Sequence, residues 1–395
     1  MRTAIAMSPG VLAKEQIDQL SKGGMIICHH HEDLEIDASA LDLRLSDRAW
    51  KLDEGQRPST RELAKMQAKS VQIKPDRCEK DPLGEYFLFE KGKIYLVELD
   101  HYVKLPGNIS GRATGKSSIG RLDVITRLLT EKSTEYDMVE AGYEGHLYLL
   151  ILSQTFSIKV SPGMSLNQLR LFSGPSHASV ITRSLIHYFG TPFWYIRHQR
   201  AKEWRCWEDL LQEYSSSRTA DPSLFDLTVD LGDEGYIYKA EPSSESRLID
   251  LRKGKASHDP KRYFERVPIA EEGAEHSVLL EVDKFYIMKS KERLCIPCDV
   301  AVEVVAISER IGDIRIHYAG FAHPGFGRHD DTSKPGTPLI FEVRATDMPT
   351  RLYDGSLLAR IQLFRMSTKT TPAVSAYDKQ ELNLSNVFAA WRDGQ

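Results

Sequence analysis

The sequence of 395 residues has few cysteines, no long apolar run and no excess of positive charge. Its five cysteines, scattered except for Cys295 and Cys298, are typical of reduced thiols in the cytosol. No apolar run approaches the roughly 20 residues that a membrane-spanning helix needs, and Met1 to Gly10 shows no secretory signal pattern. A formal net charge of -4 argues against nucleic-acid binding, which needs a basic face. We therefore expect a cytoplasmic protein without membrane or nucleic-acid partners.

What the sequence does contain is a pattern that occurs twice. Glu90 to Ile109 (EKGKIYLVELDHYVKLPGNI) matches Glu281 to Val300 (EVDKFYIMKSKERLCIPCDV), with Glu, Lys, Tyr and Pro in register. Three matched segments in one order predict a duplicated domain. The two further pairs are Leu41-Asp42-Leu43-Arg44 with Ile249-Asp250-Leu251-Arg252, and Gly163–Phe172 with Gly355–Phe364.

The repeat and the length predict two domains, each large enough for its own core. Most of each half consists of short segments rich in Ile, Val, Leu, Tyr and Phe, bounded by Gly, Pro, Asp and Asn, which indicates strands. Evenly spaced short strands are typical of barrels and sandwiches, so we expect a mainly β fold. The predicted strands are Tyr86–Phe89, Lys93–Leu99, His146–Leu152, Phe156–Val160, Val278–Val282, Phe285–Met288, Val300–Ile307, Ile314–Tyr318, Leu339–Val343 and Leu357–Phe364.

Helices are predicted at only two places. Val11–Leu20 has apolar residues at helical spacing, and Trp204–Tyr214 has a helix-like pattern inside a segment that the first half alone possesses. We therefore predict a first repeat over residues 1–175, a partly helical connector over 176–222 and a second repeat over 223–395. His323–Pro338, polar and rich in Gly and Pro, is predicted to be a loop between two strands.

The segment from Lys116 to Asp123 (KSSIGRLD) concentrates hydrogen-bond donors. The preceding Gly111 and Gly115 have three residues between them, whereas the nucleotide phosphate loop needs four, and no βαβ context surrounds them. Two adjacent hydroxyls between a Lys and an Arg nevertheless suit a polyphosphate, because Arg binds its oxygens in a bidentate manner. A polar turn with a surface ion pair remains the alternative. The stretch of the second half from Asp299 to Asp313 contains no Ser-Ser pair.

Two other groups have candidate chemistry. His30 and Glu32 with Cys295 and Cys298 imitate the zinc deaminase signature, but the expected Pro-Cys-x-x-Cys order is broken. Glu342 interrupts the apolar strand Leu339–Val343. It is either a surface residue or a desolvated carboxylate with a raised pKa that moves protons. The repeat places Leu150 opposite Glu342.

Together, these motifs resemble the dCTP deaminase branch of the trimeric dUTPase-like family. The KSSIGRLDV segment resembles its R-S-S-x-x-R-L-G phosphate motif, and LDLRL from Leu41 resembles its P-A-S-x-D-L-R-L segment. HYAGFAHPGF from His317 resembles the base-binding hairpin, and Tyr377 with Gln380 resembles the closing Y-x-x-Q segment. Glu342 falls where the family has its catalytic glutamate. The resemblance covers nearly all of the chain outside the connector and implies two tandem dUTPase-like domains, each a distorted β-barrel or jelly roll.

The resemblance also implies a zinc-free reaction, the hydrolytic deamination of dCTP to dUTP and ammonia. Glu342 would be the general base and acid that activates water for attack on C4 of cytosine. Ser117 would hold phosphates and help to place the water, and Arg121 would bind the triphosphate. A site without a metal has to supply this activation by desolvation and positioned donors.

Further substrate contacts are implied by the same resemblance. Ser118 and Lys116 would bind phosphate, the latter as a point charge because Lys stands where the family has Arg. Ala319 would present its backbone to the base, and Tyr377 and Gln380 would close the site. Mg²⁺ would arrive on the triphosphate. The family builds its site between neighbouring subunits, so a homo-oligomer with sites between domains or subunits is expected.

The two repeats divide these groups between them. The first has the phosphate motif but Leu150 at the glutamate position, and the second has Glu342 without the phosphate motif. A complete site would therefore need one repeat to face the other. A dUTPase, a bifunctional enzyme that releases dUMP, a zinc deaminase and a degenerate nucleotide-binding protein are the alternatives.

Overall fold

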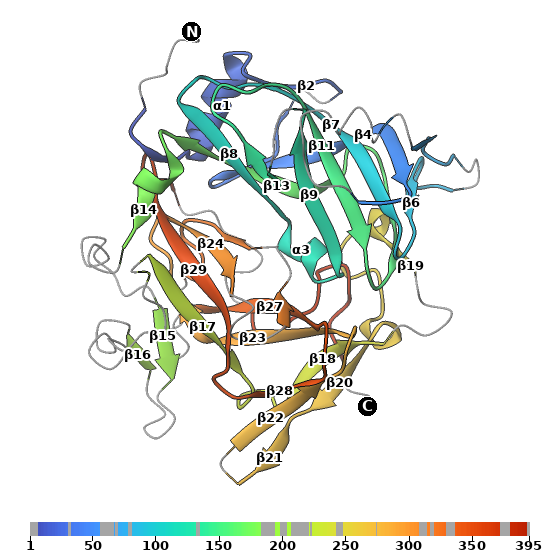
Figure 1. The fold of residues 1–395 in the computed structure, drawn as a ribbon, viewed down its shortest axis with the longest axis vertical. Coiled ribbons are helices and arrows are strands. Elements are labelled where there is room, and N and C mark those ends of the chain that lie inside the picture. The colour runs from blue at the N-terminus through green and yellow to red at the C-terminus, as the bar shows by residue number, and fades with distance from the viewer. Residues whose placement is uncertain are drawn as a thin grey trace. The chain divides into compact units, whose positions relative to one another are not determined.

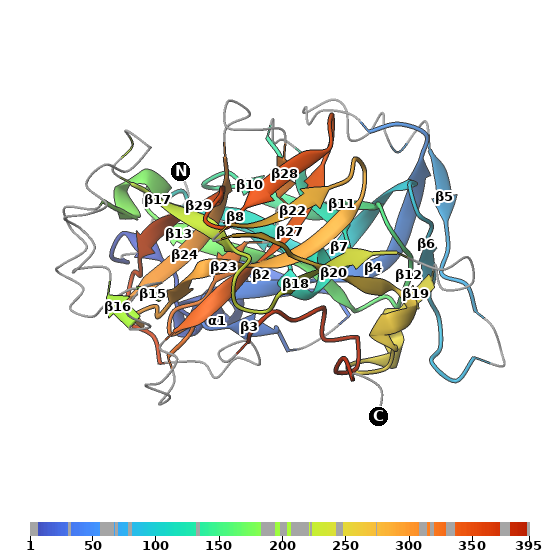
Figure 2. The same ribbon diagram turned by 90° about the horizontal axis from the view of Figure 1, so that it is seen from below.

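The chain forms two compact units of β-structure, shown in Figures 1 and 2. Unit 1 comprises Met1–Ala178, Glu241–Tyr263 and Ser385–Gln395, and unit 2 comprises Ser179–Ala240 and Phe264–Leu384. The computed structural model describes residues 7–30, 33–55, 67, 70–77, 81–131, 135–182, 194–197, 204–206, 221, 223–241, 248–273, 275–307, 314–316, 320–328, 336–371 and 380–392.

Unit 1 contains an 11-stranded sheet, counted over the described residues, with the order β10-β8-β13-β4-β7-β11-β9 and four short strands paired beside this path. A second sheet has the order β19-β12-β6. The elements are β1 (Gly10–Val11), α1 (Lys14–Lys22), β2 (Ile26–Cys28), β3 (Ile36–Asp37), β4 (Ala40–Leu52), β5 (Val71–Ile73), β6 (Phe87–Phe89), β7 (Ile94–Lys104), β8 (Ile109–Gly115), α3 (Ser117–Gly120), β9 (Val124–Thr130), β10 (Met138–Val139), β11 (Glu144–Ser153), β12 (Ser157–Val160), β13 (Ser165–Ser173), β19 (Leu248–Asp250) and the short 3-10 turns η4 (Leu251–Lys253) and η5 (Pro260–Arg262).

Unit 2 repeats this plan with a 12-stranded sheet, again counted over the described residues, in the order β16-β15-β23-β17-β29-β24-β26 and with a small sheet β21-β22-β28. A 3-10 turn, η1 (Ser176–Ser179), leads into it. Its strands are β14 (Val180–Ile181), β15 (Trp194–Arg197), β16 (Trp204–Cys206), β17 (Leu224–Asp230), β18 (Tyr236–Ala240), β20 (Phe264–Pro268), β21 (Ala270–Glu272), β22 (Glu275–Leu280), β23 (Phe285–Leu294), β24 (Val300–Ala306), β25 (Ile314–Ile316), β26 (Phe321–Ala322), β27 (Thr337–Ala345), β28 (Thr350–Tyr353) and β29 (Leu357–Arg365).

The elements follow from the apolar pattern of the sequence. In β17, Phe225, Leu227 and Val229 are buried and the residues between them are partly exposed, which is the period of two that a strand with one buried face requires. In α1, Ile17 and Leu20 are buried one turn apart. The predicted mainly β fold of two domains is thereby confirmed, and so is the short helix near the N-terminus.

The repeated Glu-x-x-Lys-x-Tyr pattern forms the same corner in both units. The Tyr95 hydroxyl accepts from the Glu90 backbone N–H at 3.2 Å, and the Tyr286 hydroxyl accepts from that of Glu281 at 3.0 Å. A turn precedes each tyrosine. Each hydroxyl thus fixes the entry into the long strand that follows, which explains why these residue types recur in register.

The central hairpins of the two units share their register. Leu150 of β11 lies opposite Leu96 of β7, and Glu342 of β27 lies opposite Ile287 of β23. Both hairpins also carry an irregularity at the same place, residues 99–101 in β7 and residues 290–292 in β23. The structure therefore places Leu150 and Glu342 at equivalent positions, as the sequence alignment predicted.

The predicted match between Leu41–Arg44 and Ile249–Arg252 is wrong. Asp42 of β4 lies opposite Gln168 of β13, and its counterpart by register is Asp226 of β17, opposite Arg360 of β29. The true counterpart of LDLR is therefore residues 225–228 (FDLT). Four residues carry too little pattern to fix a register, whereas a ladder of backbone hydrogen bonds does so.

The compact units divide the chain differently from the predicted boundaries, in the connector and in two further segments. Residues 241–263 and 385–395, which were expected in the second repeat, belong to unit 1. There β19 pairs in parallel with β12, which pairs on its other side with β6 (Figure 2). Arg252 follows β19 and joins Asp81 of unit 1 at 2.8 Å through a side chain that is 4% exposed.

The predicted connector contains strands where it is described. Trp204–Cys206 is β16 and not the start of the predicted helix, while residues 207–214 lie outside the described residues. The tryptophan-rich pattern fits either structure, and pairing of β16 with β15 decides it. Among the described helices, none is long and apolar enough to cross a membrane.

Candidate functional site

The predicted phosphate motif lies on a short helix between two strands of unit 1. Lys116 is extended at the end of β8, and α3 turns over the next four residues before β9. Ile119 and Leu122 are buried and fix this turn in the core. Ser117 and Ser118 are only partly buried, so the hydroxyl pair stays accessible at the start of α3.

Asp123 closes the motif in a conformation that favours glycine. Its φ is +58°, it is 1% exposed, and its carboxylate accepts from the Thr155 hydroxyl at 2.6 Å. Asp tolerates the left-handed region better than most residues because its short side chain bonds locally. The related motif has Gly at this position, so that substitution was the available signal for a left-handed turn.

The two basic residues of the motif differ in exposure. Arg121 is buried, with 1% of its surface exposed. Lys116 is half-buried and forms an ion pair with Asp42 of β4. Burial raises the pKa of the Asp42 carboxyl above its ordinary value, and Lys116 offsets only part of that rise. The Lys116 ammonium is thus held beside the hydroxyl pair by a carboxylate that sequence analysis did not assign to the site.

Glu342 is buried in the middle of β27 in unit 2, with 2% of its surface exposed. The neighbouring residues Phe341 and Val343 are also buried. The surface-residue interpretation of Glu342 is therefore wrong. A carboxylate held out of water is costly unless it is compensated, and such groups are enriched at functional sites. Its predicted raised pKa stays a prediction.

The described part of the C-terminal segment touches elements that carry the predicted site residues. The Gln380 side chain donates to the Pro338 carbonyl of β27 at 3.1 Å. The Ser385 hydroxyl, 2% exposed, donates to the Ser118 carbonyl of α3 at 2.7 Å. Gln380 is thus fixed in unit 2 on the strand of Glu342, and Ser385 is fixed in unit 1 on the phosphate motif.

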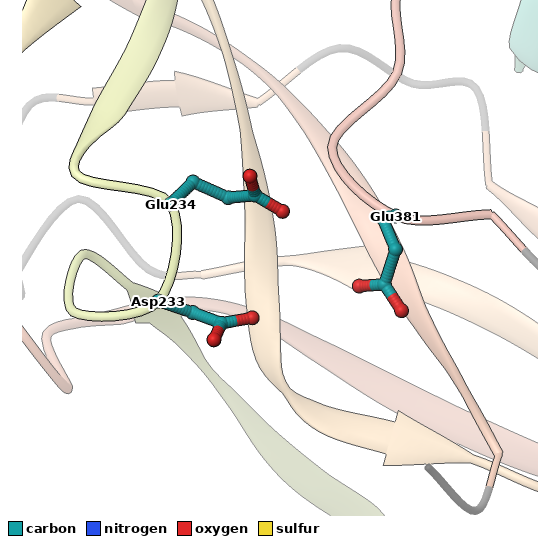
Figure 3. A group of neighbouring side chains, drawn as sticks. All are labelled: Asp233, Glu234 and Glu381. Atoms are coloured by element: carbon teal, nitrogen blue, oxygen red, sulfur yellow. The ribbon is translucent and has the colours of Figure 1, made fainter.

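Three carboxylates cluster in unit 2 (Figure 3). Asp233 and Glu234 point from the loop after β17 toward Glu381 of the C-terminal segment, and their oxygens lie within 4.8 Å of one another. The cation that they surround is Lys289, whose ammonium lies 2.7 Å from Asp233 and 3.5 Å from Glu381. Burial alone lowers the pKa of Lys289, but the carboxylates, Asp233 first, raise it above the ordinary value. The cluster is therefore an ion-pair network around a buried lysine.

His30, one of the residues of the zinc deaminase interpretation, has another partner. His30 Nδ1 lies 2.5 Å from Asp100, within unit 1. Burial raises the pKa of the Cys295 thiol, which disfavours the thiolate form that zinc requires. Glu32 lies outside the described residues.

The structure thus divides the predicted site residues between the units. Lys116, Ser117, Ser118 and Arg121 gather in unit 1, and Glu342 and Gln380 lie in unit 2. Ala319 and Tyr377 lie outside the described residues. Sequence reasoning missed three partners of the motif, which are Asp42, Thr155 and Ser385, because each lies far away in the sequence.

Comparisons with known proteins match both halves of the chain. Two family models, described as the N-terminal and C-terminal domains of 2'-deoxycytidine 5'-triphosphate deaminase, match residues 8–175 and 200–388. The crystal structure of the 2'-deoxycytidine 5'-triphosphate deaminase from Agrobacterium tumefaciens aligns with a TM-score of 0.73 at 28% identity, covering 91% of this chain and 99% of that one.

Curated relatives match smaller parts. The "dCTP deaminase, dUMP-forming" of Acidothermus cellulolyticus is 32% identical over 116 residues, which is 29% of this chain and 54% of that protein. The protein of the same name from Streptomyces coelicolor is 27% identical over 163 residues, which is 41% of this chain and 79% of that protein. The first alignment therefore spans little more than half of its relative. The two domain models together span most of the chain, and on this ground the chain belongs to the dCTP deaminase family.

Proposed function

We propose that this protein deaminates dCTP, with water as the nucleophile and ammonia as the leaving group. The observation that carries the proposal is Glu342, a buried carboxylate at the register position where unit 1 has Leu150. The phosphate motif on α3 supplies the complementary half. The names of the related proteins and the match to a dCTP deaminase structure support the same substrate.

Glu342 would transfer the protons of the reaction. It would take a proton from water as the oxygen attacks C4 of cytosine, then pass protons to the exocyclic nitrogen as the C–N bond breaks. The net change is dCTP plus water to dUTP plus ammonia. A buried base suits this role because desolvation brings the pKa of a carboxyl toward the working pH.

The motif on α3 would bind the triphosphate, which carries its own Mg²⁺ as part of the substrate. Ser117 and Ser118 offer hydroxyl donors, and Lys116 offers an ammonium that Asp42 already holds in place. Arg121 would add bidentate contacts to phosphate oxygens. Phosphate contacts of this kind position the base without acting on it chemically.

The product distinguishes two versions of the proposal. A deaminase that stops at dUTP leaves the triphosphate intact. The relatives named "dUMP-forming" favour a second step in which another water releases pyrophosphate, so that dCTP and two waters give dUMP, ammonia and pyrophosphate.

Product analysis tests the proposal. Protein treated with a zinc chelator is incubated with dCTP and Mg²⁺, and dUTP, dUMP and ammonia are followed by chromatography. We expect deamination in the wild type and a fall in kcat of about 100- to 10,000-fold in Glu342→Gln. Glu265→Gln, which removes a half-exposed carboxylate of the same unit, is the control and should leave kcat unchanged. Nucleotide binding without turnover would favour the degenerate binding protein.

We further propose that the chain works as a homo-oligomer, with sites that join a phosphate motif to a Glu342. The division of the two groups between the units supports this, as does an internal repeat, which the matching register of the sheets favours. Mixing Ser117→Ala with Glu342→Gln tests it by complementation. Recovery of activity means that the two groups of one site come from different chains, and no recovery after subunit exchange means that they come from the same chain.

A further inference from the structure

The C-terminal segment is held in unit 2 by a bidentate ion pair. The Glu381 carboxylate accepts from two nitrogens of Arg293, at 3.0 and 3.1 Å, and Lys289 lies 3.5 Å away. The Arg293 side chain is 6% exposed and that of Lys289 is 3% exposed. Ion pairs of two planar groups with two parallel hydrogen bonds are stronger than single contacts and fix orientation.

This anchor is built on the strand that pairs with the strand of Glu342. Arg293 of β23 lies opposite Pro338 of β27, Lys289 lies opposite Ile340, and Ile287 lies opposite Glu342. Gln380, next to Glu381 in the chain, donates to the Pro338 carbonyl. Gln380 and Glu381 are therefore both fixed on the β23–β27 hairpin.

The same segment reaches α3 a few residues later. Only three residues separate Glu381 from Ser385, whose hydroxyl donates to the Ser118 carbonyl at 2.7 Å. Beyond Ser385 the segment stays in place through backbone hydrogen bonds, for example from Ala256 to Asn386 at 2.9 Å. The chain from Glu381 to Ser385 can span at most about 14 Å, so a displacement of Glu381 beyond that reach pulls on Ser385.

In the described part of unit 1, no equivalent anchor occurs on β7. By register, Tyr102 stands at the position of Arg293 and Glu98 at that of Lys289. A phenol and a carboxylate cannot hold a second carboxylate as two cations do. The anchor therefore occurs in the unit that carries Glu342, which links it to the site rather than to the fold that both units share.

We propose that Glu381 is a positioning residue: its ion pairs with Arg293 and Lys289 fix the C-terminal segment so that Ser385 holds the α3 backbone in the geometry that binds triphosphate. The inference rests on the proposed function, because the ligand is the triphosphate of dCTP. Glu381 touches neither the base nor the reacting water in this scheme. Its loss should weaken substrate binding and leave the chemical step intact.

Steady-state kinetics with MgdCTP test this. Glu381→Gln is expected to raise KM about tenfold with kcat nearly unchanged, since the lost interaction serves ground state and transition state alike. Ser385→Ala should raise KM in the same direction. The matched control is Glu281→Gln, which removes a Lys239 ion pair of 2.8 Å in the same unit and should leave KM unchanged.

A double-mutant cycle separates positioning from general destabilisation. Arg293→Met and Glu381→Gln should each raise KM, and the double variant should be no worse than the single variants, because residues of one interaction are not additive. Additive KM effects, or an unchanged KM in Glu381→Gln, would overturn the proposal. So would a loss of kcat that follows a lowered melting temperature, because that indicates a structural role.

The two proposals fail in different ways. Wild-type protein that turns over dCTP while Glu381→Gln keeps its KM refutes only the positioning role. Wild-type protein that binds dCTP without turnover refutes deamination, and the dissociation constants of the same variants, measured by titration calorimetry with MgdCTP, then decide the positioning role. Wild-type protein that neither binds nor converts dCTP refutes both.

Discussion

Units 1 and 2 use the same hairpin for different purposes. In unit 1, Leu150 packs against an apolar cluster that includes Leu96, Leu129 and Tyr148. In unit 2, the equivalent position carries the buried Glu342. The strand register is the same in both hairpins, while the side chains at this position differ. The difference teaches that one unit carries the proposed catalytic carboxylate and the other carries the phosphate motif.

The charge pattern along the two long strands has diverged in the same way. Glu98 of β7 pairs with Arg48 at 2.9 Å, whereas its counterpart Lys289 of β23 is surrounded by carboxylates. The aspartates Asp42 and Asp226 show a similar change of partner. Asp226 pairs with Arg360 directly across the sheet at 2.9 Å, while Asp42 faces Gln168 and pairs with Lys116 instead.

The largest expected effect comes from making unit 2 resemble unit 1. Glu342→Leu removes the proposed base and should lower kcat for dCTP by about 100- to 10,000-fold, because general acid–base catalysis contributes this much. The reciprocal Leu150→Glu should not raise kcat, since it places a carboxylate in an apolar cluster. Steady-state kinetics check both variants. A wild-type kcat in Glu342→Leu would show that Glu342 is not the catalytic base.

The next effect concerns Glu292, which stands where unit 1 has His101. Glu292 is 2% exposed and accepts from the Thr228 N–H and hydroxyl, both at 2.7 Å, and burial raises its pKa from 4.5 to about 7. Because the pKa is raised, the folded state binds more protons than the unfolded state when the pH lies between 4.5 and about 7. Its contribution to stability is therefore complete below pH 4.5 and is lost as the pH rises through about 7.

We expect the free energy of unfolding to fall by about 2–3 kcal/mol from about pH 5 to about pH 8 through this group. Glu292→Gln cannot titrate and should lose this part of the pH dependence, whatever its own stability. Urea unfolding of both proteins at the two pH values gives the difference. If the free energy of unfolding changes by the same amount between the two pH values in both proteins, Glu292 stays ionised when buried.

A smaller effect is expected from the paired aspartates. Asp42→Asn leaves Lys116 without its carboxylate and should raise KM for MgdCTP roughly fivefold, corresponding to about 1 kcal/mol of lost positioning. Asp226→Asn weakens a cross-strand pair with Arg360 and should change the free energy of unfolding by up to about 1 kcal/mol, with KM unchanged. Kinetics and thermal unfolding of both variants sharpen the comparison. Equal KM values would assign Asp42 to the fold alone.

The smallest effect is expected where the units agree. Lys51 pairs with Glu90 at 2.5 Å, and Lys239 pairs with Glu281 at 2.8 Å, at the corner that both tyrosines fix. The Lys51–Glu90 pair is well exposed, so Lys51→Gln should cost less than about 1 kcal/mol of stability. Lys239 is more buried and has a second partner in Glu265, so Lys239→Gln should cost more. Chemical denaturation of the two variants checks which of them loses more stability.

Much of the fold follows from local sequence because apolar alternation and turn residues act over short distances. The long strands, the helix near the N-terminus and the equivalence of Leu150 with Glu342 were all predictable. The position of Ile249–Arg252 was not, because parallel pairing of β19 with β12 joins residues about ninety positions apart. Trp204–Cys206 was assigned to a helix because aromatic patterns do not distinguish a helix from a short paired strand.

The proposed site could be derived from the sequence where its motif is continuous. Polar residues in an apolar context can be recognised from the sequence, as at Lys116 to Arg121 and at Glu342. The residues that support them were not predictable from the sequence. Tertiary contacts alone bring together Asp42, Ser385 and the Arg293–Glu381 pair. An aspartate in place of the motif's glycine was a signal in the sequence itself, because it implies the left-handed turn that Asp123 adopts.

The parallel strand β19 also bears on the order in which the protein folds. The ribosome makes residues 248–250 after the first part of unit 2 and residues 385–392 after all of it, yet both segments complete unit 1. Until they emerge, the side of β12 that β19 will cover stays open, and an open strand edge is a site for incorrect pairing. Unit 1 therefore cannot be finished as an independent product of early synthesis, and a cut after residue 178 would leave it permanently incomplete.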